Sequence, residues 1–187
     1  EQTGLYEAGV EVVVAGRGES SAVLVDGHVV AGTKTLVERA AGRSWRVAAD
    51  GFWQVHEAAP DTLVAAVLAG LAPREGESAW DLYCGVGLFA GPLVDAGCVV
   101  RGVESSGRAV RDAARNVPRA DVEAGRVEQV IRRWPTHVDL VVCDPPRTGL
   151  GKAVVEQVVR RKPRRVAYVA CDPAALARDV GTFQAAG

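Results

Sequence analysis

Two side chains that could do chemistry follow apolar runs late in the sequence. Cys171 closes the run Val-Ala-Tyr-Val-Ala-Cys, and Asp144 closes the run Val-Val-Cys-Asp. Residues 173–187 predict a helix directly behind the cysteine, and the dipole at a helix N-terminus favours a thiolate. Because the thiolate is the nucleophilic form of cysteine, this position predicts covalent catalysis at Cys171, with a buried core cysteine as the common alternative.

A glycine-rich turn lies at residues 81–89, Asp-Leu-Tyr-Cys-Gly-Val-Gly-Leu-Phe. Gly85 and Gly87 allow the backbone to approach a ligand closely. Glu104 closes the next apolar run roughly 20 residues on, a spacing typical of a carboxylate that binds ribose hydroxyls. Asp81 would repel a pyrophosphate, so a dinucleotide is disfavoured and a cationic nucleoside such as S-adenosylmethionine fits better. The alternative is a structural turn in an unrelated α/β domain.

The elements that must position these residues alternate along the chain. We expect strands at 78–84, 98–104, 138–146 and 164–171, with a weaker strand at 126–131. We expect helices at 57–73, 87–97, 107–117, 151–162 and 173–187. This alternation predicts βαβ units and a parallel sheet with right-handed crossovers. Glu104, Asp144 and Cys171 then lie at the carboxyl ends of strands, where sites form in such sheets.

The first part of the sequence has a different pattern. Short valine-rich runs separated by glycine and aspartate predict strands at 10–16, 22–27, 28–32 and 43–51. We therefore expect a small β-rich element at residues 1–50 and an α/β domain at residues 51–187.

Composition narrows the class of protein. The 187 residues are 48% hydrophobic and 24% charged, which is typical of globular proteins. No apolar run approaches the roughly 18–20 residues of a membrane span, and the N-terminus lacks a signal-peptide pattern, so we expect a cytoplasmic protein without a membrane contact. The four cysteines form no CxxC pair, which argues against a metal site.

A basic run, Arg-Arg-Lys-Pro-Arg-Arg, occupies residues 160–165 in a chain whose net charge is −1. It precedes the strand predicted at 164–171 and so lies at the amino end of that strand, away from the edge where sites form. We interpret it as a solvated loop, with RNA contact as the alternative.

In combination, five motifs resemble those of the RNA 5-methyluridine (uracil-5-)methyltransferases. In order, the matching residues are 51–56, 81–89, 103–106, 144–147 and 168–179. The resemblance covers most of residues 40–187, and the last motif, which holds the cysteine, is the most specific. It implies a doubly wound, Rossmann-like methyltransferase sheet in an α/β domain. The sheet would be C-terminally truncated, because the family's sheet has two further strands.

The resemblance also implies roles for individual residues. Cys171 matches the family's nucleophile, and the residues that match its S-adenosylmethionine site are Gln54, Tyr83, Gly85, Glu104 and Asp144. The implied reaction is transfer of a methyl group from S-adenosylmethionine to carbon 5 of a uridine in tRNA or ribosomal RNA. The thiolate would add to carbon 6 of the base, which divides one difficult step into easier ones.

Some family features have no counterpart in these residues. The family commonly has Asn where His56 stands, and its general base is a Glu in a downstream stretch that this sequence does not contain. We therefore expect the chain by itself to be inactive. Two alternatives remain, an RNA cytosine-5 methyltransferase and a cofactor- or RNA-binding module without catalysis. In the cytosine family a second cysteine follows proline at the place where Arg147 follows Pro146 here.

Overall fold

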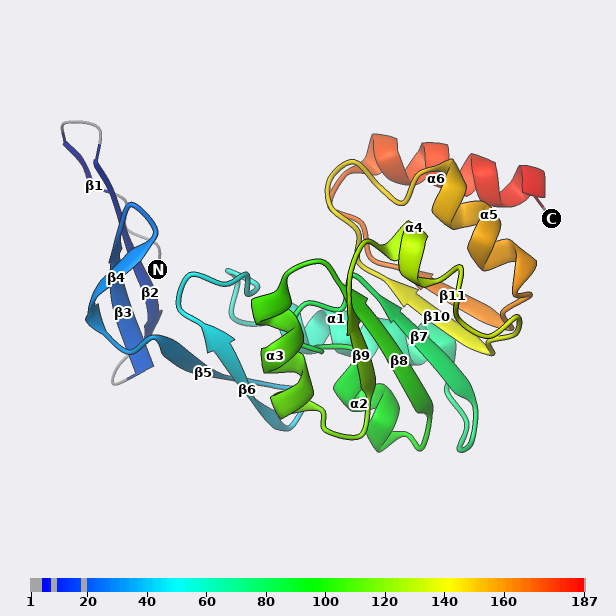
Figure 1. Ribbon diagram of the computed structural model, residues 1–187, viewed down its shortest axis with the longest axis horizontal. Helices are drawn as coiled ribbons and strands as arrows, with labels where there is room; N and C mark the ends of the chain where they lie inside the picture. The colour runs from blue at the N-terminus through cyan, green and yellow to red at the C-terminus, as the bar shows by residue number, and fades with distance from the viewer. Residues whose placement is uncertain (1–4, 8–9, 18–19, 187) are drawn as a thin grey trace. The chain divides into compact units, whose positions relative to one another are not determined.

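The computed structural model describes residues 5–7, 10–17 and 20–186, so the end of the helix predicted to reach Gly187 lies outside the described residues. The chain divides into two compact units, residues 1–61 and residues 62–187 (Figure 1). The domain boundary that the sequence predicts after residue 50 stays a prediction.

The first unit is built from antiparallel strands. A four-stranded sheet has the order β1-β2-β3-β4, and β5 pairs with β6 in a hairpin. The strands are β1 Leu5–Glu7, β2 Val10–Arg17, β3 Ser20–Val25, β4 His28–Gly32, β5 Thr35–Ala40 and β6 Arg43–Ala48. Strands β1 and β5 were not predicted. The two charged residues of β5 interrupt its apolar pattern, and its pairing with β6 identifies it as a strand.

The second unit contains a parallel five-stranded sheet with the order β11-β10-β7-β8-β9. Its strands are β7 Ser78–Leu82, β8 Val99–Glu104, β9 Asp121–Ala124, β10 Leu140–Cys143 and β11 Arg165–Tyr168. The chain runs outward from β7 to β9 and then returns to the other side of β7, so the strand order reverses between β7 and β10. This topology confirms the predicted doubly wound α/β sheet, and its switch point is where ligands bind in such folds.

Four helices connect successive strands of this sheet, α2 Ala90–Asp95, α3 Gly107–Asn116, α4 Val127–Val130 and α5 Lys152–Arg160. Helix α1 Ala59–Leu71 precedes β7, and helix α6 Pro173–Ala186 follows β11. Helix α3 packs on β8 and β9, and α5 packs against α4 and α6 (Figure 1).

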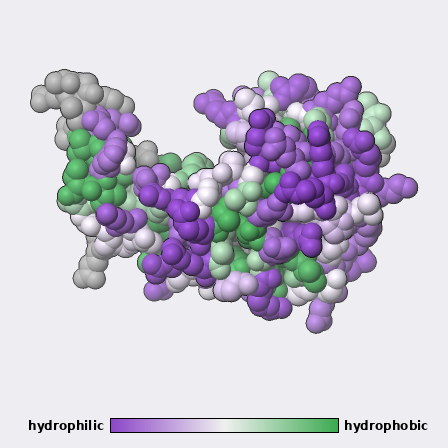
Figure 2. All heavy atoms as spheres, in the orientation of Figure 1, coloured by the Kyte–Doolittle hydropathy of each residue, from purple (hydrophilic) through white to green (hydrophobic). Residues whose placement is uncertain are grey.

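Helix α5 shows why these segments become helices. Its buried positions Val154, Val155 and Val158 recur at helical spacing and face the core. The opposite side carries Glu156, which pairs with charged residues four positions away on either side. Figure 2 accordingly shows mostly hydrophilic residues over α4 and α5 on the visible face of the second unit.

The main core lies between the sheet and helices α4 and α5. Trp80 of β7 and Trp134 meet edge to face with their ring centroids 5.0 Å apart, and the Arg161 guanidinium lies 5.6 Å from the Trp80 ring. An aromatic pair of this kind contributes about 0.5–1.5 kcal/mol beyond its buried area. The same cluster includes buried residues at the carboxyl ends of β7 and β10, Leu82 and Cys143, so packing fixes the strand ends that position the site.

Two predictions about elements were wrong. Residues 126–131 were expected to form a strand, but α4 lies there and the third strand, β9, precedes it. Strand β9 is a short edge strand with two acidic residues, so its own sequence gives a weak strand signal. Its pairing with β8 is what makes the segment a strand. Strand β11 ends at Tyr168, so Cys171 does not close the strand but lies three residues beyond it.

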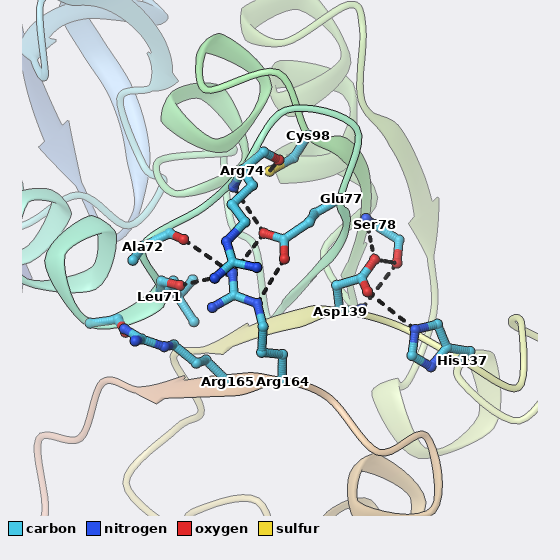
Figure 3. Close-up of polar contacts among 11 residues, drawn as sticks. Leu71, Ala72, Arg74, Glu77, Ser78, Cys98, His137, Asp139, Arg164 and Arg165 are labelled. Atoms are coloured by element: carbon cyan, nitrogen blue, oxygen red, sulfur yellow. Dashed lines mark hydrogen bonds and ion pairs between the residues drawn. The ribbon is translucent and has the colours of Figure 1, made fainter.

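The amino ends of the strands are held by a set of ion pairs (Figure 3). Arg164 donates from Nε and Nη2 to the two carboxylate oxygens of Glu77, each at 2.7 Å. Nη2 of Arg164 also reaches the carbonyls of Leu71 and Ala72 at the end of α1, and Arg165 donates to the Gly70 carbonyl at 2.7 Å. Cations there satisfy the last carbonyls of the helix.

A second pair of side chains ties β7 to the segment before β10. The carboxylate of Asp139 accepts hydrogen bonds from the backbone N–H of Ser78 at 2.8 Å and from its hydroxyl at 2.7 Å. His137 lies 3.2 Å from the other oxygen of this carboxylate (Figure 3). No helix among the described residues is both long and apolar enough to cross a membrane.

Candidate active site

The parallel register brings four strand ends to one edge of the sheet. Leu82 pairs with Val103 on one side and with Cys143 on the other, and Cys143 pairs with Tyr168. The residues that follow these positions therefore share the carboxyl edge. They are the glycine-rich turn after β7, Glu104, Asp144 and the segment that carries Cys171.

The turn after β7 has an unusual backbone. Tyr83 has a φ of +63° and Gly85 a φ of +53°. A bulky residue in the left-handed region costs about 1–3 kcal/mol, and such strain gathers at ligand sites. The Tyr83 side chain packs against the main core, and burial raises its pKa to about 12, so the phenol stays protonated.

Glu104 fastens this turn to the next strand–helix junction. Its Oε2 accepts a hydrogen bond from the Gly85 N–H at 3.2 Å, and its Oε1 accepts from the Ser106 N–H at 2.7 Å and the Ser105 hydroxyl at 3.0 Å. A carboxylate offers about four acceptor positions, so capacity is left for a ligand hydroxyl. The half-buried carboxylate is thus oriented before any ligand arrives.

Asp81 is a buried carboxylate with one oxygen unused. The residue is 0% exposed, and its Oδ2 accepts a hydrogen bond from the Ala90 N–H at 2.8 Å. Its Oδ1 has no hydrogen-bond partner among the described residues. Burial raises the pKa of Asp81 to about 7, and the charges of Asp144 and Glu104 raise it further while the Ala90 N–H opposes the shift.

Asp144 follows β10 directly and is half-buried. Its N–H donates to the Leu82 carbonyl at 3.2 Å, which fixes it beside the turn after β7. Burial raises the pKa of Asp144 to about 6. Three carboxylates, Asp81, Glu104 and Asp144, thus lie at one edge, and an unused buried oxygen among them fits a ligand that brings hydrogen-bond donors and positive charge.

The amino group and sulfonium of S-adenosylmethionine have that chemistry, and its ribose offers hydroxyls to a carboxylate such as Glu104. The residues present therefore fit this cofactor. No cluster of histidine, cysteine, aspartate or glutamate side chains that could hold a metal ion occurs in the described part of the chain.

Cys171 differs from the other three cysteines. It is exposed, whereas Cys84, Cys98 and Cys143 are buried, and burial raises the pKa of each of these three thiols. Helix α6 begins two residues after Cys171, and the Asp172 side chain caps it by accepting the Ala175 N–H at 2.8 Å. Cys171 thus lies in a short segment between a strand end and a capped helix start.

Gln54 is half-buried and belongs to the first unit. It follows Trp53, whose ring lies 6.3 Å from that of the buried Trp45. Within the second unit, Tyr83, Gly85, Glu104 and Asp144 lie at the carboxyl ends of neighbouring strands, and Cys171 lies three residues beyond the carboxyl end of β11. The part that Gln54 plays in cofactor binding stays a prediction.

Sequence reasoning missed Asp179 of α6, which is fully buried and bonded to the loop that follows Asp144. The sequence does contain one signal for this residue, which is its position on the predicted helix. Ala175, Asp179 and Phe183 recur every four residues, so the aspartate lies on the face of α6 that meets the core. A carboxylate on a core-facing position is unfavourable unless it has specific partners.

Comparisons with known proteins show which proteins the chain resembles as a whole. No protein-family model matches the chain. Over 168 residues it is 55% identical to an uncharacterized RNA methyltransferase of Streptomyces avermitilis, covering 86% of this chain and 39% of the relative. Over 109 residues it is 36% identical to the 23S rRNA (uracil(1939)-C(5))-methyltransferase RlmD of Acidithiobacillus ferrooxidans, covering 52% and 24%. The chain thus spans about two fifths of the length of the first relative.

Solved structures of methyltransferases resemble the fold of this chain. The tRNA (uracil-54, C5)-methyltransferase of Pyrococcus abyssi, solved with S-adenosyl-L-homocysteine, matches with a TM-score of 0.72 and 31% identity over 83% of this chain and 39% of that chain. A TehB-like SAM-dependent methyltransferase of Corynebacterium glutamicum matches with a TM-score of 0.53 and 20% identity, covering 67% of this chain and 72% of that chain. The chain therefore has the Rossmann-like fold of S-adenosylmethionine-dependent methyltransferases and is related in sequence to RNA methyltransferases.

Proposed function

We propose that the protein is an S-adenosylmethionine-dependent RNA methyltransferase that modifies carbon 5 of a uridine in tRNA or ribosomal RNA, with Cys171 as the nucleophile. The observation that carries this proposal is the exposure of Cys171 at the edge that also holds Glu104 and Asp144, while the other cysteines are buried. The relatives that act on uracil in RNA support the choice of base. A cytoplasmic location remains part of the proposal.

Each residue at the edge has a task in this proposal. Glu104 would bind the ribose hydroxyls of the cofactor, and the turn at Tyr83 and Gly85 would contact it through backbone. Asp81 and Asp144 would face its positive charge. When bound, the cofactor supplies an electrophilic methyl group.

Cys171 supplies the activation that uracil lacks. Its thiolate forms a bond to carbon 6 of the base, and the electron pair displaced from the double bond makes carbon 5 nucleophilic. After carbon 5 is methylated, a base removes its proton, the double bond re-forms, and the bond from sulfur to carbon 6 breaks. The thiolate is regenerated, so the cysteine is a true catalyst.

The experiment is a methyl-transfer assay on the whole protein with radiolabelled S-adenosylmethionine and unmodified tRNA or ribosomal RNA. Nucleoside analysis should give labelled 5-methyluridine, and Cys171→Ala should abolish it while the control Cys98→Ala, a cysteine outside the carboxyl edge, retains it. Labelled 5-methylcytidine would refute the uridine assignment. Cofactor binding without methyl transfer to either RNA would instead support a binding module.

A further inference from the structure

Asp179 is a buried carboxylate that joins three segments of the chain and is not one of the proposed cofactor-binding residues. Its Oδ2 accepts hydrogen bonds from the Leu150 N–H at 2.6 Å and from the Tyr168 hydroxyl at 2.8 Å. The carboxylate is 0% exposed. Two directional donors on one buried oxygen fix the relative positions of three chain segments more tightly than apolar packing would.

The three segments are those that carry the candidate catalytic groups. Tyr168 is the last residue of β11 and precedes Cys171 by three residues. Leu150 belongs to the loop that begins at Asp144 and leads into α5. Asp179 itself lies on α6, which starts two residues after Cys171. The short segment that bears the cysteine is therefore tied to Asp179 at both of its ends.

The loop after Asp144 is shaped to admit this carboxylate. Gly149 has a φ of +78°, and a Cβ at that position would meet the Asp179 carboxylate and the Arg178 guanidinium closer than any real side chain allows. Arg178 adds a second tie to the same loop, because its Nη2 donates to the Thr148 carbonyl at 2.6 Å.

The Tyr168 hydroxyl is suited to be a permanent donor. Burial raises its pKa above the ordinary value, and the hydrogen bond to Asp179 raises it further. The phenol therefore stays protonated at neutral pH, and the junction does not open there by titration of this group.

We propose that Asp179 is a positioning residue that, through Tyr168 and Leu150, sets where Cys171 stands relative to the loop that begins at Asp144. This inference rests on the proposed function, since it assigns a role in catalysis to a residue that would act through Tyr168 and Leu150. Misplacing a reacting group by about 1 Å can cost about 100-fold in rate.

The test uses Tyr168→Phe in the whole protein, because it deletes one hydroxyl and keeps the ring that packs on the core. The matched control is Thr182→Val, which deletes a hydroxyl that donates to the Arg178 carbonyl on the same helix. We expect Tyr168→Phe to lower kcat for methyl transfer about 10-fold to 100-fold. The KM for S-adenosylmethionine should stay unchanged, and Asp179→Asn, which keeps an acceptor oxygen, should retain more activity than Asp179→Ala.

A second readout is independent of methyl transfer. The rate at which iodoacetamide alkylates Cys171, read by mass spectrometry, should change several-fold in Tyr168→Phe and not in Thr182→Val. An unchanged alkylation rate in Tyr168→Phe would overturn the inference, as would a change in KM for the cofactor with kcat unaffected. A wild-type protein that is alkylated at Cys171 but never methylates RNA would contradict the proposed function. The alkylation rates would still show whether Tyr168 positions Cys171.

Discussion

The two ends of the parallel strands in the second unit differ in how their polar groups are satisfied. At the amino ends, Arg164 and Glu77 form a two-point ion pair and Asp139 accepts two hydrogen bonds from Ser78. At the carboxyl ends, one oxygen of the buried Asp81 has no partner among the described residues, and Tyr83 has a strained backbone. The amino ends stabilise the fold, whereas the carboxyl ends keep hydrogen-bonding capacity for a ligand.

This difference also revises the interpretation of the basic run at residues 160–165. Arg161 donates to the Ile131 carbonyl at 2.6 Å, and Arg164 and Arg165 bind the end of α1. Hydrogen bonds thus tie these three arginines to the fold, so the run is not a freely solvated loop. The RNA-contact alternative is weakened, although Arg165 stays exposed and charged, and the exposed Lys162 provides its test.

The largest effect should come from removing the carboxylate that fastens the glycine-rich turn. Glu104→Ala loses the acceptor for the Gly85 and Ser106 N–H groups as well as the proposed ribose contact. Because charged hydrogen bonds contribute about 1.5–3 kcal/mol, S-adenosylmethionine affinity should fall about 10-fold to 100-fold or more in isothermal titration calorimetry. Glu75→Ala, an exposed acidic residue before β7 at the amino ends of the strands, is the control, and wild-type affinity in Glu104→Ala would contradict the role of Glu104.

A smaller effect is expected for Asp81→Asn, which should raise the stability of the fold and lower the affinity for the cofactor. The folded pKa of about 7 lies above the ordinary 3.8, so the unfolded chain ionises first as the pH rises. Ionised Asp81 therefore lowers stability progressively from about pH 4 to pH 7, and the penalty is full above pH 7.

Asp81→Asn should then raise the free energy of unfolding at pH 8 by on the order of 1 kcal/mol or more, and with it the thermal midpoint, while weakening cofactor binding about tenfold. In the wild type, cofactor affinity should fall as the pH is lowered through about 7, where the carboxylate gains a proton. A variant that loses stability at pH 8 and binds the cofactor normally would show that the unused oxygen is not a ligand site.

Breaking the amino-end ion pair should affect stability alone. In Glu77→Gln the guanidinium of Arg164 loses its charged partner, so the thermal midpoint at pH 7 should fall. Because Glu77 lies at the opposite strand ends from the site, the cofactor affinity of the variant should stay within about twofold of the wild-type affinity. The Arg164 hydrogen bonds hold the pKa of Glu77 below its usual value of 4.5. The wild-type advantage over Glu77→Gln is therefore present above that pH and disappears as the pH falls below it.

The smallest effect is expected for the basic run. Lys162→Gln removes an exposed charge at the amino ends of the strands, far along the sheet from the carboxyl edge. RNA affinity in a filter-binding assay should change by no more than about twofold. A loss of an order of magnitude would restore the RNA-contact interpretation and weaken the distinction between the two strand ends.

Sequence reasoning reached the carboxyl edge because local patterns encode it. Apolar runs that end in Glu104 and Asp144 place both carboxylates at strand ends before any contact is known. It did not reach the Arg164–Glu77 pair, whose members are 87 residues apart, or the bond from Asp179 to Leu150. Helical spacing could have indicated that Asp179 is buried, but the partners in both contacts are set by the assembled sheet and cannot be identified from the periodicity of the sequence.

The most direct test of the central claim is trapping on RNA that contains 5-fluorouridine. The whole protein would be incubated with this RNA and S-adenosylmethionine, and the products resolved by denaturing electrophoresis. Fluorine cannot leave carbon 5 as a proton does, so the bond from Cys171 to carbon 6 persists. We predict a covalent complex that is lost in Cys171→Ala and retained in Cys98→Ala. No complex with either tRNA or ribosomal RNA, or a complex that survives Cys171→Ala, would contradict the account.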